Sequence, residues 1–268
     1  MSTLVFVHAH PDDEATLTGG TMALAHRRGH RVVSICCTDG SLGTPEESTL
    51  DTEAERAVDR AVAEVRRREA GASAEILGVD RLVFLDHRDS GMTGWASNDD
   101  PEAFMNADPA QVGQQIAAIL DEEDADVLIG YDWHGNYGHP DHVMVHRVVA
   151  EALTRARRTP RLLQATMNRD AMRERHDPNQ EHSIDPDSPA DDGNPFGTPE
   201  AELAWSVDVS EVVMVKRQAL SAHASQSDAA VLLAMPEELW AVGFAREYYI
   251  EDGVAPLREG WPFDPAAG

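Results

Sequence analysis

Lysine is almost absent from this chain, and positive charge is scarce. Lys216 is the only lysine, and 22 basic residues stand against 48 acidic ones, which gives a net charge of −26. Such a surface repels nucleic-acid phosphates and anionic lipids, so we expect no nucleic-acid and no membrane partner. Apolar runs are also short, and none approaches the roughly 18 residues that a membrane helix needs.

Cysteine is nearly missing as well. Cys36 and Cys37 are adjacent, so on a strand their side chains would point to opposite faces, and we interpret both as small buried residues without a disulfide. The sequence has no CxxC pair, no glycine-rich phosphate loop and no internal repeat. An apolar run at 4–7 follows the first residues directly, without a basic segment before it, so we expect no secretory signal and a cytoplasmic location. The oligomeric state stays open, a homo-oligomer included.

Apolar runs alternate with amphipathic segments through residues 1–165. Continuous apolar runs predict buried strands at 4–7, 32–37, 82–85 and 127–130. Helical spacing of apolar residues, together with Asp-Pro and Pro starts, predicts helices at 16–28 and 52–77 and from residues 109 and 140. This alternation predicts an α/β fold with an open, mostly parallel, doubly wound sheet and helices on both faces.

The remaining residues, 166–268, are less regular. We expect them to form a smaller C-terminal α/β part, packed on the core that residues 1–165 build. Residues 173–200 hold five prolines and many acids without periodicity, which predicts a long acidic loop. A strand at 206–209, a helix at 211–224, a strand at 244–250 and an irregular tail are expected to follow.

Two histidine–acid motifs, residues 10–14 (HPDDE) and 139–142 (HPDH), each follow a predicted strand. In open α/β sheets ligands bind outside the carboxyl ends of the strands, so both motifs should meet at one rim. His10, Asp13 and His142 would offer a metal ion two imidazoles and a carboxylate, with one position open. Zn²⁺ suits this set, and Fe²⁺ fits the same ligands.

The side chains beside these ligands are candidates for acid–base chemistry. Asp12 could act as a general base and later pass the proton to a leaving amine. His139, expected at a helix N-terminus, could stabilise an oxyanion or protonate the leaving group, with Asp141 orienting its imidazole. HPDDE alone could be a proline turn with a solvated acidic cap, and HPDH alone could be a helix start with capping acids. Their joint position favours a metal-dependent hydrolase.

At these residues the sequence resembles the PIG-L/LmbE-like N-acetylglucosamine deacetylases. That family consists of zinc-dependent enzymes on a Rossmann-like fold that remove acetyl groups from amino sugars. Residues 9–14 (AHPDDE) and 138–142 (GHPDH) match its two signature motifs, and residues 88–92 (RDSGM) and 216–226 extend the resemblance. The family pattern implies the same metal ligands and the same roles for Asp12 and His139. The RDSGM segment and the loop before HPDH look most similar to the mycothiol branch.

The resemblance also implies substrate contacts. Asp89 and Arg66 would bind the sugar, and Tyr137 would lie on a mobile loop over the site. The residues alone leave alternatives open, because Asp89 could form a turn and Tyr137 could pack. Arg66, Arg67 and Arg68 are consecutive, which leaves open which of them faces the sugar, and all three could lie on a solvated helix face. We interpret His223 as a packing residue.

The loops at 39–49 and 173–200 differ from what the mycothiol branch leads us to expect. Both are expected to flank the substrate, so the acceptor beyond the sugar is left open. Trp95 and Trp133 fall in loops near the rim, where they could stack on a sugar or simply pack.

Three functions follow from these residues. The first is hydrolysis of an N-acyl amide, expected to be N-acetyl, on a small amino sugar or glycoconjugate, which releases acetate and a free amine. The second is an amidase acting on a mycothiol-like thiol conjugate or a natural-product intermediate. The third is a metal- or sugar-binding protein without turnover, against which Asp12 and His139 argue because a pure binder needs neither.

Overall fold

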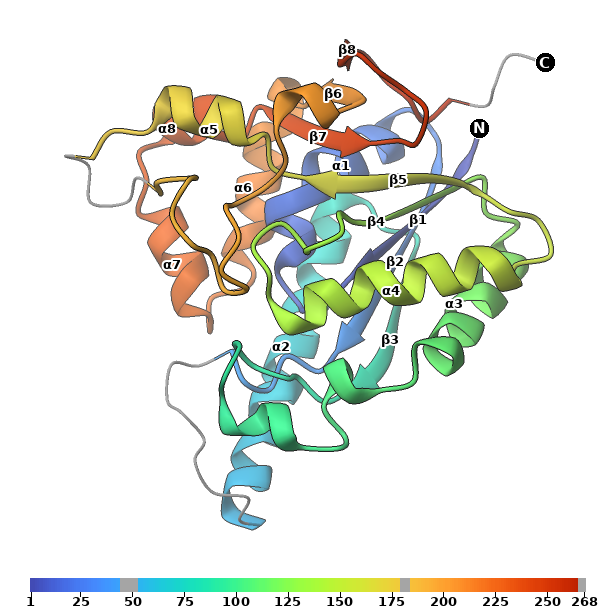
Figure 1. Cartoon of the computed structure of the whole chain (residues 1–268), viewed down its shortest axis with the longest axis vertical. Helices are drawn as coiled ribbons and strands as arrows, with labels where there is room; N and C mark the ends of the chain where they lie inside the picture. Colours follow the sequence, from blue (N-terminus) through green and yellow to red (C-terminus); the bar gives the residue numbers. More distant parts are fainter. Residues whose placement is uncertain (44–52, 179–183, 265–268) are drawn as a thin grey trace.

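The computed structural model describes residues 1–43, 53–178 and 184–264. Within these ranges one eight-stranded sheet, in the order β3-β2-β1-β4-β5-β7-β6-β8, forms the centre of the molecule (Figure 1). The strands are β1 (Thr3–His8), β2 (Arg31–Thr38), β3 (Arg81–His87), β4 (Val127–Tyr131), β5 (Arg161–Thr166), β6 (Trp205–Asp208), β7 (Arg246–Ile250) and β8 (Arg258–Glu259). Strands β1 to β5 run parallel, whereas β7 is antiparallel to both β5 and β6.

Helices cover both faces of this sheet (Figure 1). They are α1 (Gly19–Arg27), α2 (Glu53–Leu77), α3 (Pro109–Glu123), α4 (Pro140–Arg155), α5 (Arg169–Arg175), α6 (Val213–Ser221), α7 (Ser227–Leu233) and α8 (Glu237–Gly243). The Asp-Pro start predicted for α3 is present, because Asp108 accepts the Ala110 N–H at 2.9 Å and Pro109 is the first helical residue. A π-helical turn, η1 (Glu14–Thr18), leads into α1.

The alternation of side chains along β1 explains the two covered faces. Leu4 and Phe6 belong to an apolar cluster that includes residues of α1 and α6. Val5 and Val7 belong to a second cluster, with residues of α3 and α4. A strand that is buried on both faces needs apolar residues at every position, which is why it reads as a continuous run. The predicted open, mostly parallel α/β sheet with helices on both faces is therefore confirmed.

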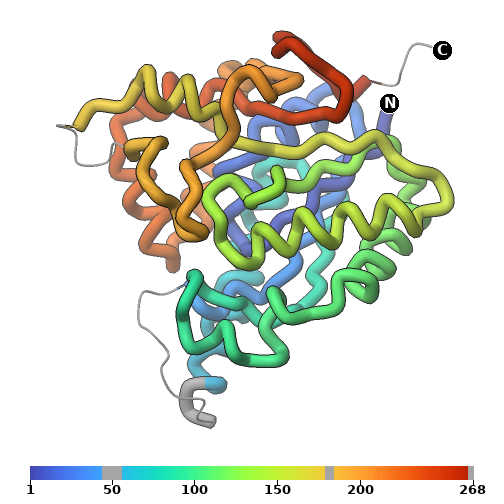
Figure 2. Tube along the Cα trace, in the orientation of Figure 1, coloured from blue at the N-terminus to red at the C-terminus, as the bar shows by residue number. Residues whose placement is uncertain are grey.

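The C-terminal residues differ from the sequence-based expectation in their detail. The structure adds the strand β5, the helices α5, α7 and α8, and the short strand β8 within the predicted tail. Strands β6, β7 and β8 continue the sheet of the first 165 residues, with β7 paired to β5. Figure 2 shows the orange segment that holds α6 beside the blue segment that holds α1. A domain boundary at residue 165 stays a prediction.

A buried ion pair links the C-terminal segments to α1. Lys216 of α6 donates from Nζ to Glu247 Oε1 of β7 at 2.7 Å, and both side chains are 2% exposed. The Glu247 carboxylate also accepts the N–H groups of Gly20 and Thr21 at 2.8 Å, at the start of α1. A carboxylate at a helix N-terminus satisfies unpaired N–H groups and interacts favourably with the helix dipole.

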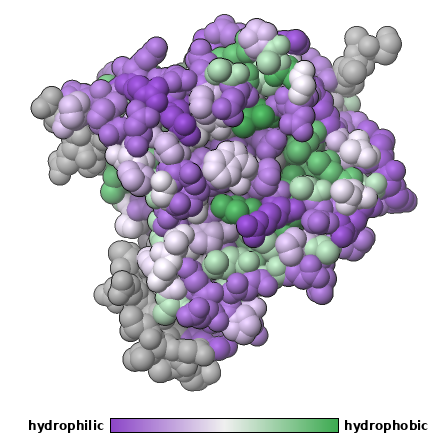
Figure 3. Space-filling model, viewed as in Figure 1, coloured by the Kyte–Doolittle hydropathy of each residue, from purple (hydrophilic) through white to green (hydrophobic). Residues whose placement is uncertain are grey.

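The surface agrees with the acidic composition. Hydrophilic residues, in purple, cover most of the face seen in Figure 3, with smaller apolar areas between them. Among the described residues, no helix has the length and apolar character needed to cross a membrane.

Candidate active site

The two histidine–acid motifs meet at the point where the strand order of the sheet reverses. Strands β1 and β4 are neighbours, with β2 and β3 on one side of the pair and β5 on the other. The first motif follows β1, and the second begins α4 after β4. This reversal opens a crevice at the carboxyl ends of the strands, which is where open α/β sheets bind ligands.

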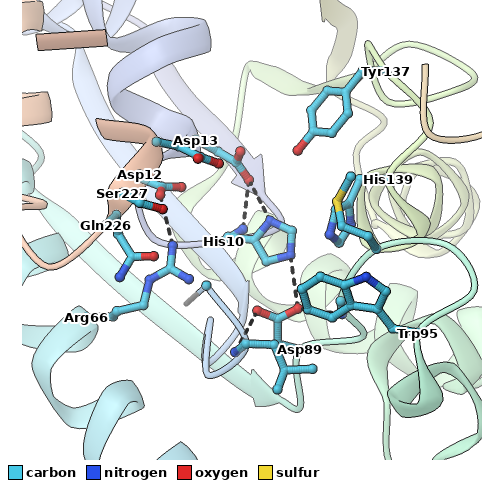
Figure 4. A pocket seen from close by; sticks show the side chains of 15 residues that line it. His10, Asp12, Asp13, Arg66, Asp89, Trp95, Tyr137, His139, Gln226 and Ser227 are labelled. Atoms are coloured by element: carbon cyan, nitrogen blue, oxygen red, sulfur yellow. Dashed lines mark hydrogen bonds and ion pairs between the residues drawn. The ribbon is translucent and has the colours of Figure 1, made fainter. Parts of the chain in front are cut away.

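His10, Asp13 and His142 come together in this crevice. His10 Nδ1 lies 3.3 Å from His142 Nε2 and 3.4 Å from Asp13 Oδ2, and His142 Nε2 lies 3.3 Å from Asp13 Oδ1. All three side chains are at least nine-tenths buried. Figure 4 shows Asp13 pointing toward the His10 ring. Burial alone would raise the pKa of Asp13, but His142 and His10 lower it well below its usual value.

A glycine fixes the orientation of His142. The Gly135 carbonyl lies 3.1 Å from His142 Nδ1, so Nδ1–H can donate to it and leave the Nε2 lone pair facing His10 and Asp13. Gly135 has a φ of +63°, and a Cβ atom there would lie 2.1 Å from His142 Cβ. Only glycine fits this contact.

We expect Gly135→Ala to destabilise the fold and to displace His142. The control is Gly253→Ala, since Gly253 also has a positive φ, +75°, but nothing lies within 4 Å of a Cβ added there. Both substitutions carry the cost of a left-handed backbone, whereas the steric overlap of Gly135→Ala adds about 1–3 kcal/mol. Urea unfolding measures the difference, and equal losses in the two variants would contradict this account.

The opposite edge of the His10 ring faces two further acids. His10 Nε2 lies 3.1 Å from Asp141 Oδ2 and 3.6 Å from Asp89 Oδ1. Burial lowers the pKa of His10, but the surrounding acids, led by Asp89, raise it well above its usual value. Among the described residues, side-chain atoms that can bind a metal form two overlapping groups, and within each group these atoms lie within 4.8 Å of one another. One group is His10, His139 and His142, and the other is His10, Asp89, His139 and Asp141.

The orientation of His139 differs from the expected one. His139 contacts the main chain of Asp141 and not its carboxylate: the Asp141 N–H donates to His139 Nδ1 at 3.1 Å, in the arrangement of an N-cap for α4. The Asp141 carboxylate turns to His10 instead, because it also accepts from Ser90. Burial, with His10 and His142 nearby, lowers the pKa of His139 well below its usual value. A neutral ring that accepts at Nδ1 carries its proton on Nε2, and His139 lines the pocket.

Asp12 is held from two sides. Its N–H donates to Glu14 Oε2 at 2.9 Å, and its carboxylate pairs with Arg66 Nη2 at 3.0 Å. Arg66 also donates to the carbonyls of Pro11 and Gly40. These contacts hold Asp12 at a φ of 117°, a strained conformation that costs about 1–3 kcal/mol and is most often found at functional sites. Burial raises the pKa of Asp12 to about 6, although Arg66 lowers it.

The register of the three consecutive arginines is now clear. Arg66 is 2% exposed and faces the site, whereas Arg67 and Arg68 lie on the exposed face of α2. The prediction of a solvated face therefore holds for two of them and is wrong for Arg66. Because the Arg66 donors hold Asp12 and two carbonyls, its contact with a sugar stays a prediction.

His10, Asp12, Asp13, Arg66, Asp89, Tyr137 and His139 all line one pocket of about 290 Å³ (Figure 4). Tyr137 Oη lies 3.5 Å from His142 Nε2, and Trp95 forms part of the wall. The rest of the lining falls largely in segments that the sequence had indicated: Leu42 and Gly43 in the loop at 39–49, Gly91 and Met92 in the RDSGM segment, and Gln226 in the segment 216–226. Sequence reasoning did not single out Ser227 and Asp228. Gln226 ends the segment 216–226, whose resemblance to the family was the available signal.

His223 of that same segment is fully buried, as its interpretation as a packing residue requires. It also has a polar partner, since His223 Nε2 lies 2.7 Å from Glu14 Oε1. Burial lowers the pKa of His223, but Glu14 raises it above its usual value. The segment 216–226 thereby reaches the motif that carries Asp12 and Asp13.

The acidic loop contacts the loop that carries Tyr137. The Asp191 N–H donates to the Tyr137 carbonyl at 2.9 Å, and the Gly197 N–H donates to the Asn136 carbonyl at 2.6 Å. Residues 44–49 of the loop at 39–49, and residues 179–183 of the acidic loop, lie outside the described residues. Trp133 is 55% exposed and is not among the residues that line the pocket.

Sequence comparison decides the family. The family model described as PIG-L, GlcNAc-PI de-N-acetylase, matches residues 5–153, which include both histidine–acid motifs. This chain belongs to the PIG-L family. It is 35% identical over 289 residues to a 1D-myo-inositol 2-acetamido-2-deoxy-alpha-D-glucopyranoside deacetylase from Mycobacterium sp. (strain KMS), covering 99% of this chain and 89% of that relative. The resemblance to the mycothiol branch is confirmed.

Solved structures share the fold of this PIG-L protein at low identity. The N,N'-diacetylchitobiose deacetylase from Pyrococcus horikoshii matches with a TM-score of 0.53 and 21% identity, over 93% of this chain and 82% of that one. The 4-carboxy-2-hydroxymuconate hydratase GalB from Pseudomonas putida KT2440 matches with a TM-score of 0.58 and 18% identity, over 97% and 100%. A deacetylase and a hydratase thus share this architecture, so the reaction must be argued from the site.

Proposed function

We propose that this chain is a metal-dependent deacetylase that hydrolyses an N-acetyl group on an amino sugar or small glycoconjugate. The convergence of His10, Asp13 and His142 carries this proposal. His10 and Asp13 line one pocket together with Asp12, and His142 is fully buried behind them. The names of the relatives in the PIG-L family support the N-acetylated amino sugar as the substrate class.

The three side chains fit a divalent ion. Ligand atoms around a tetrahedral ion with bonds of about 2.0–2.1 Å lie about 3.3–3.4 Å apart. The 3.3 Å between His10 Nδ1 and His142 Nε2 matches this value, and the two Asp13 oxygens lie 3.4 and 3.3 Å from these two nitrogens. When bound, the ion would supply Lewis acidity, which lowers the pKa of a water molecule toward neutrality and polarises the acyl carbonyl.

Asp12 and His139 are assigned to the proton transfers. The Asp12 carboxylate, with a pKa of about 6, accepts a proton from the attacking water and returns it to the leaving amine. His139 Nε2–H, with Nδ1 occupied by the Asp141 N–H, donates to the oxygen of the carbonyl as charge develops there. Arg66 keeps the Asp12 carboxylate in place.

The pocket supports a small substrate. A volume of about 290 Å³ is just below the range for ligand pockets, roughly 300–1,000 Å³. Trp95 offers a flat apolar wall against which a sugar ring can stack, while Asp89 and Tyr137 offer polar contacts. An amidase for a mycothiol-like conjugate would use the same catalytic side chains and differ only in the group that binds this wall.

Acetate release provides the test. We expect acetate from the N-acetylglucosaminyl-inositol named for the mycobacterial relative, or from N,N'-diacetylchitobiose. Treatment with a chelator is expected to remove at least about 99% of the activity, because the Lewis acid is lost, and added Zn²⁺ or Fe²⁺ is expected to restore it. A mycothiol S-conjugate in parallel separates the amidase, which would release an amine but no acetate. Failure to hydrolyse any N-acetylated amino sugar would reject the proposal.

A further inference from the structure

The two ring nitrogens of His10 have different surroundings. Nδ1 faces His142 and Asp13, at 3.3 and 3.4 Å, whereas Nε2 points away from them and lies 3.1 Å from Asp141 Oδ2. A histidine that holds a metal through one nitrogen donates the N–H of the other to a partner, which fixes the ring and raises its basicity. For His10 the geometry makes Nδ1 the metal-facing atom and Nε2–H the donor.

Two acids compete for that N–H, and distance separates them. Asp89 Oδ1 is 3.6 Å from His10 Nε2, which is too long for a hydrogen bond, and Asp89 accepts the Gly91 N–H at 2.9 Å. Asp141 Oδ2, at 3.1 Å, is within hydrogen-bond range. Asp141 is therefore the outer partner of His10, although it belongs to the motif that supplies His142.

Ser90 holds the Asp141 carboxylate in this position. Its N–H donates to Asp141 Oδ2 at 2.9 Å, and its hydroxyl donates to Asp141 Oδ1. The Met105 N–H donates to Ser90 Oγ at 3.0 Å, which leaves the hydroxyl proton of Ser90 for the carboxylate. Both Ser90 and Asp141 are fully buried, so water does not compete for these bonds.

We propose that Ser90 and Asp141 are positioning residues for the metal site, because together they orient His10 with Nδ1 toward Asp13 and His142. This inference rests on the proposed function, since it assigns the outer support of the metal ligand. It assigns the Asp141 carboxylate to orienting His10 instead of His139, and it gives Ser90, the serine of the RDSGM segment, a role. The His139 contact of Asp141 is a main-chain one, which a side-chain substitution leaves in place.

Zinc affinity in the absence of substrate is the decisive measurement. Metal-free protein is titrated with Zn²⁺ in competition with a fluorescent chelator, for wild type, Asp141→Asn, Ser90→Ala and Ser97→Ala. Loss of an outer partner weakens metal binding by roughly 10–100-fold, so we expect that rise in Kd for Asp141→Asn and about tenfold for Ser90→Ala. Ser97→Ala is the matched control, because Ser97 Oγ donates to the Ser90 carbonyl at 2.7 Å in the same loop but does not touch Asp141.

The kcat of acetate release at saturating Zn²⁺ distinguishes positioning from catalysis. We expect kcat of the Ser90→Ala and Asp141→Asn proteins to be low at limiting Zn²⁺ and to rise as Zn²⁺ is added, because the loss acts through metal occupancy. Wild-type zinc affinity in both variants would overturn the inference. A lowered kcat with unchanged zinc affinity in Asp141→Asn would also overturn it, and would support a role of Asp141 in orienting His139 instead. Ser90→Ala decides the question alone if Asp141→Asn fails to fold. A wild-type protein that binds no divalent metal would overturn both this inference and the proposed function.

Discussion

Asp12→Asn protein is expected to release acetate about 10²- to 10⁴-fold more slowly than wild type, because an amide cannot accept the proton that a general base takes. The loss should fall on kcat rather than on KM. Asp12 lies beside the three proposed metal ligands and is not one of them, and its contact with Arg66 can persist through the amide oxygen. Metal content should therefore stay at the wild-type level.

One further measurement and one control variant test the assignment of Asp12. Metal analysis of the purified Asp12→Asn protein separates loss of the base from loss of the site. Asp99→Asn, an exposed carboxylate outside the pocket, is the control for a general effect of removing negative charge. Near-wild-type acetate release by metal-loaded Asp12→Asn would reject the assignment of Asp12 as the base.

Glu247→Gln is expected to destabilise the fold by about 3–5 kcal/mol, because it leaves the buried Lys216 ammonium without a counter-charge. Lys216→Met should cost less. The Glu247 carboxylate would still accept the N–H groups of Gly20 and Thr21 in that variant, whereas the ammonium has no comparable substitute. Glu247→Gln is therefore the more costly substitution, because the charge that remains in Lys216→Met, the Glu247 carboxylate, still has hydrogen-bond donors.

Urea unfolding of the metal-loaded protein measures both losses. The double variant Lys216→Met/Glu247→Gln removes both charges, so we expect it to be more stable than Glu247→Gln alone. Equal destabilisation by Glu247→Gln and Lys216→Met would contradict the account. So would a double variant whose loss equals the sum of the two single losses, since paired charges are coupled.

The sequence predicted the elements whose pattern is local. The runs at 4–7, 32–37 and 127–130 became β1, β2 and β4, because a strand buried on both faces must be apolar throughout. The helices α5, α7 and α8, each of seven residues, were missed, since two turns are too short to display helical periodicity. Strand β5 was missed too, because its sequence RLLQAT mixes polar with apolar residues.

For the candidate site, too, the sequence predicted one part and not the other. The meeting of His10, Asp13 and His142 could be predicted, since both motifs follow strands and parallel strands end at one edge. The partners of those residues could not. The contact of His223 with Glu14 joins residues far apart in the chain, and the choice between His10 and His139 as partner of Asp141 depends on the position of Ser90. Such contacts depend on tertiary packing, which leaves no local pattern.

The burial of the only lysine has a practical consequence for chemical labelling. Acylating reagents that attack amines need a free, solvent-accessible ε-amino group, and here that group is enclosed between α6 and β7 and bound to Glu247. In the native protein, side-chain amine labelling should therefore be negligible. Acylation at Lys216, followed by mass spectrometry over time, would report how often α6 separates from β7 and exposes this amine, without any engineered probe.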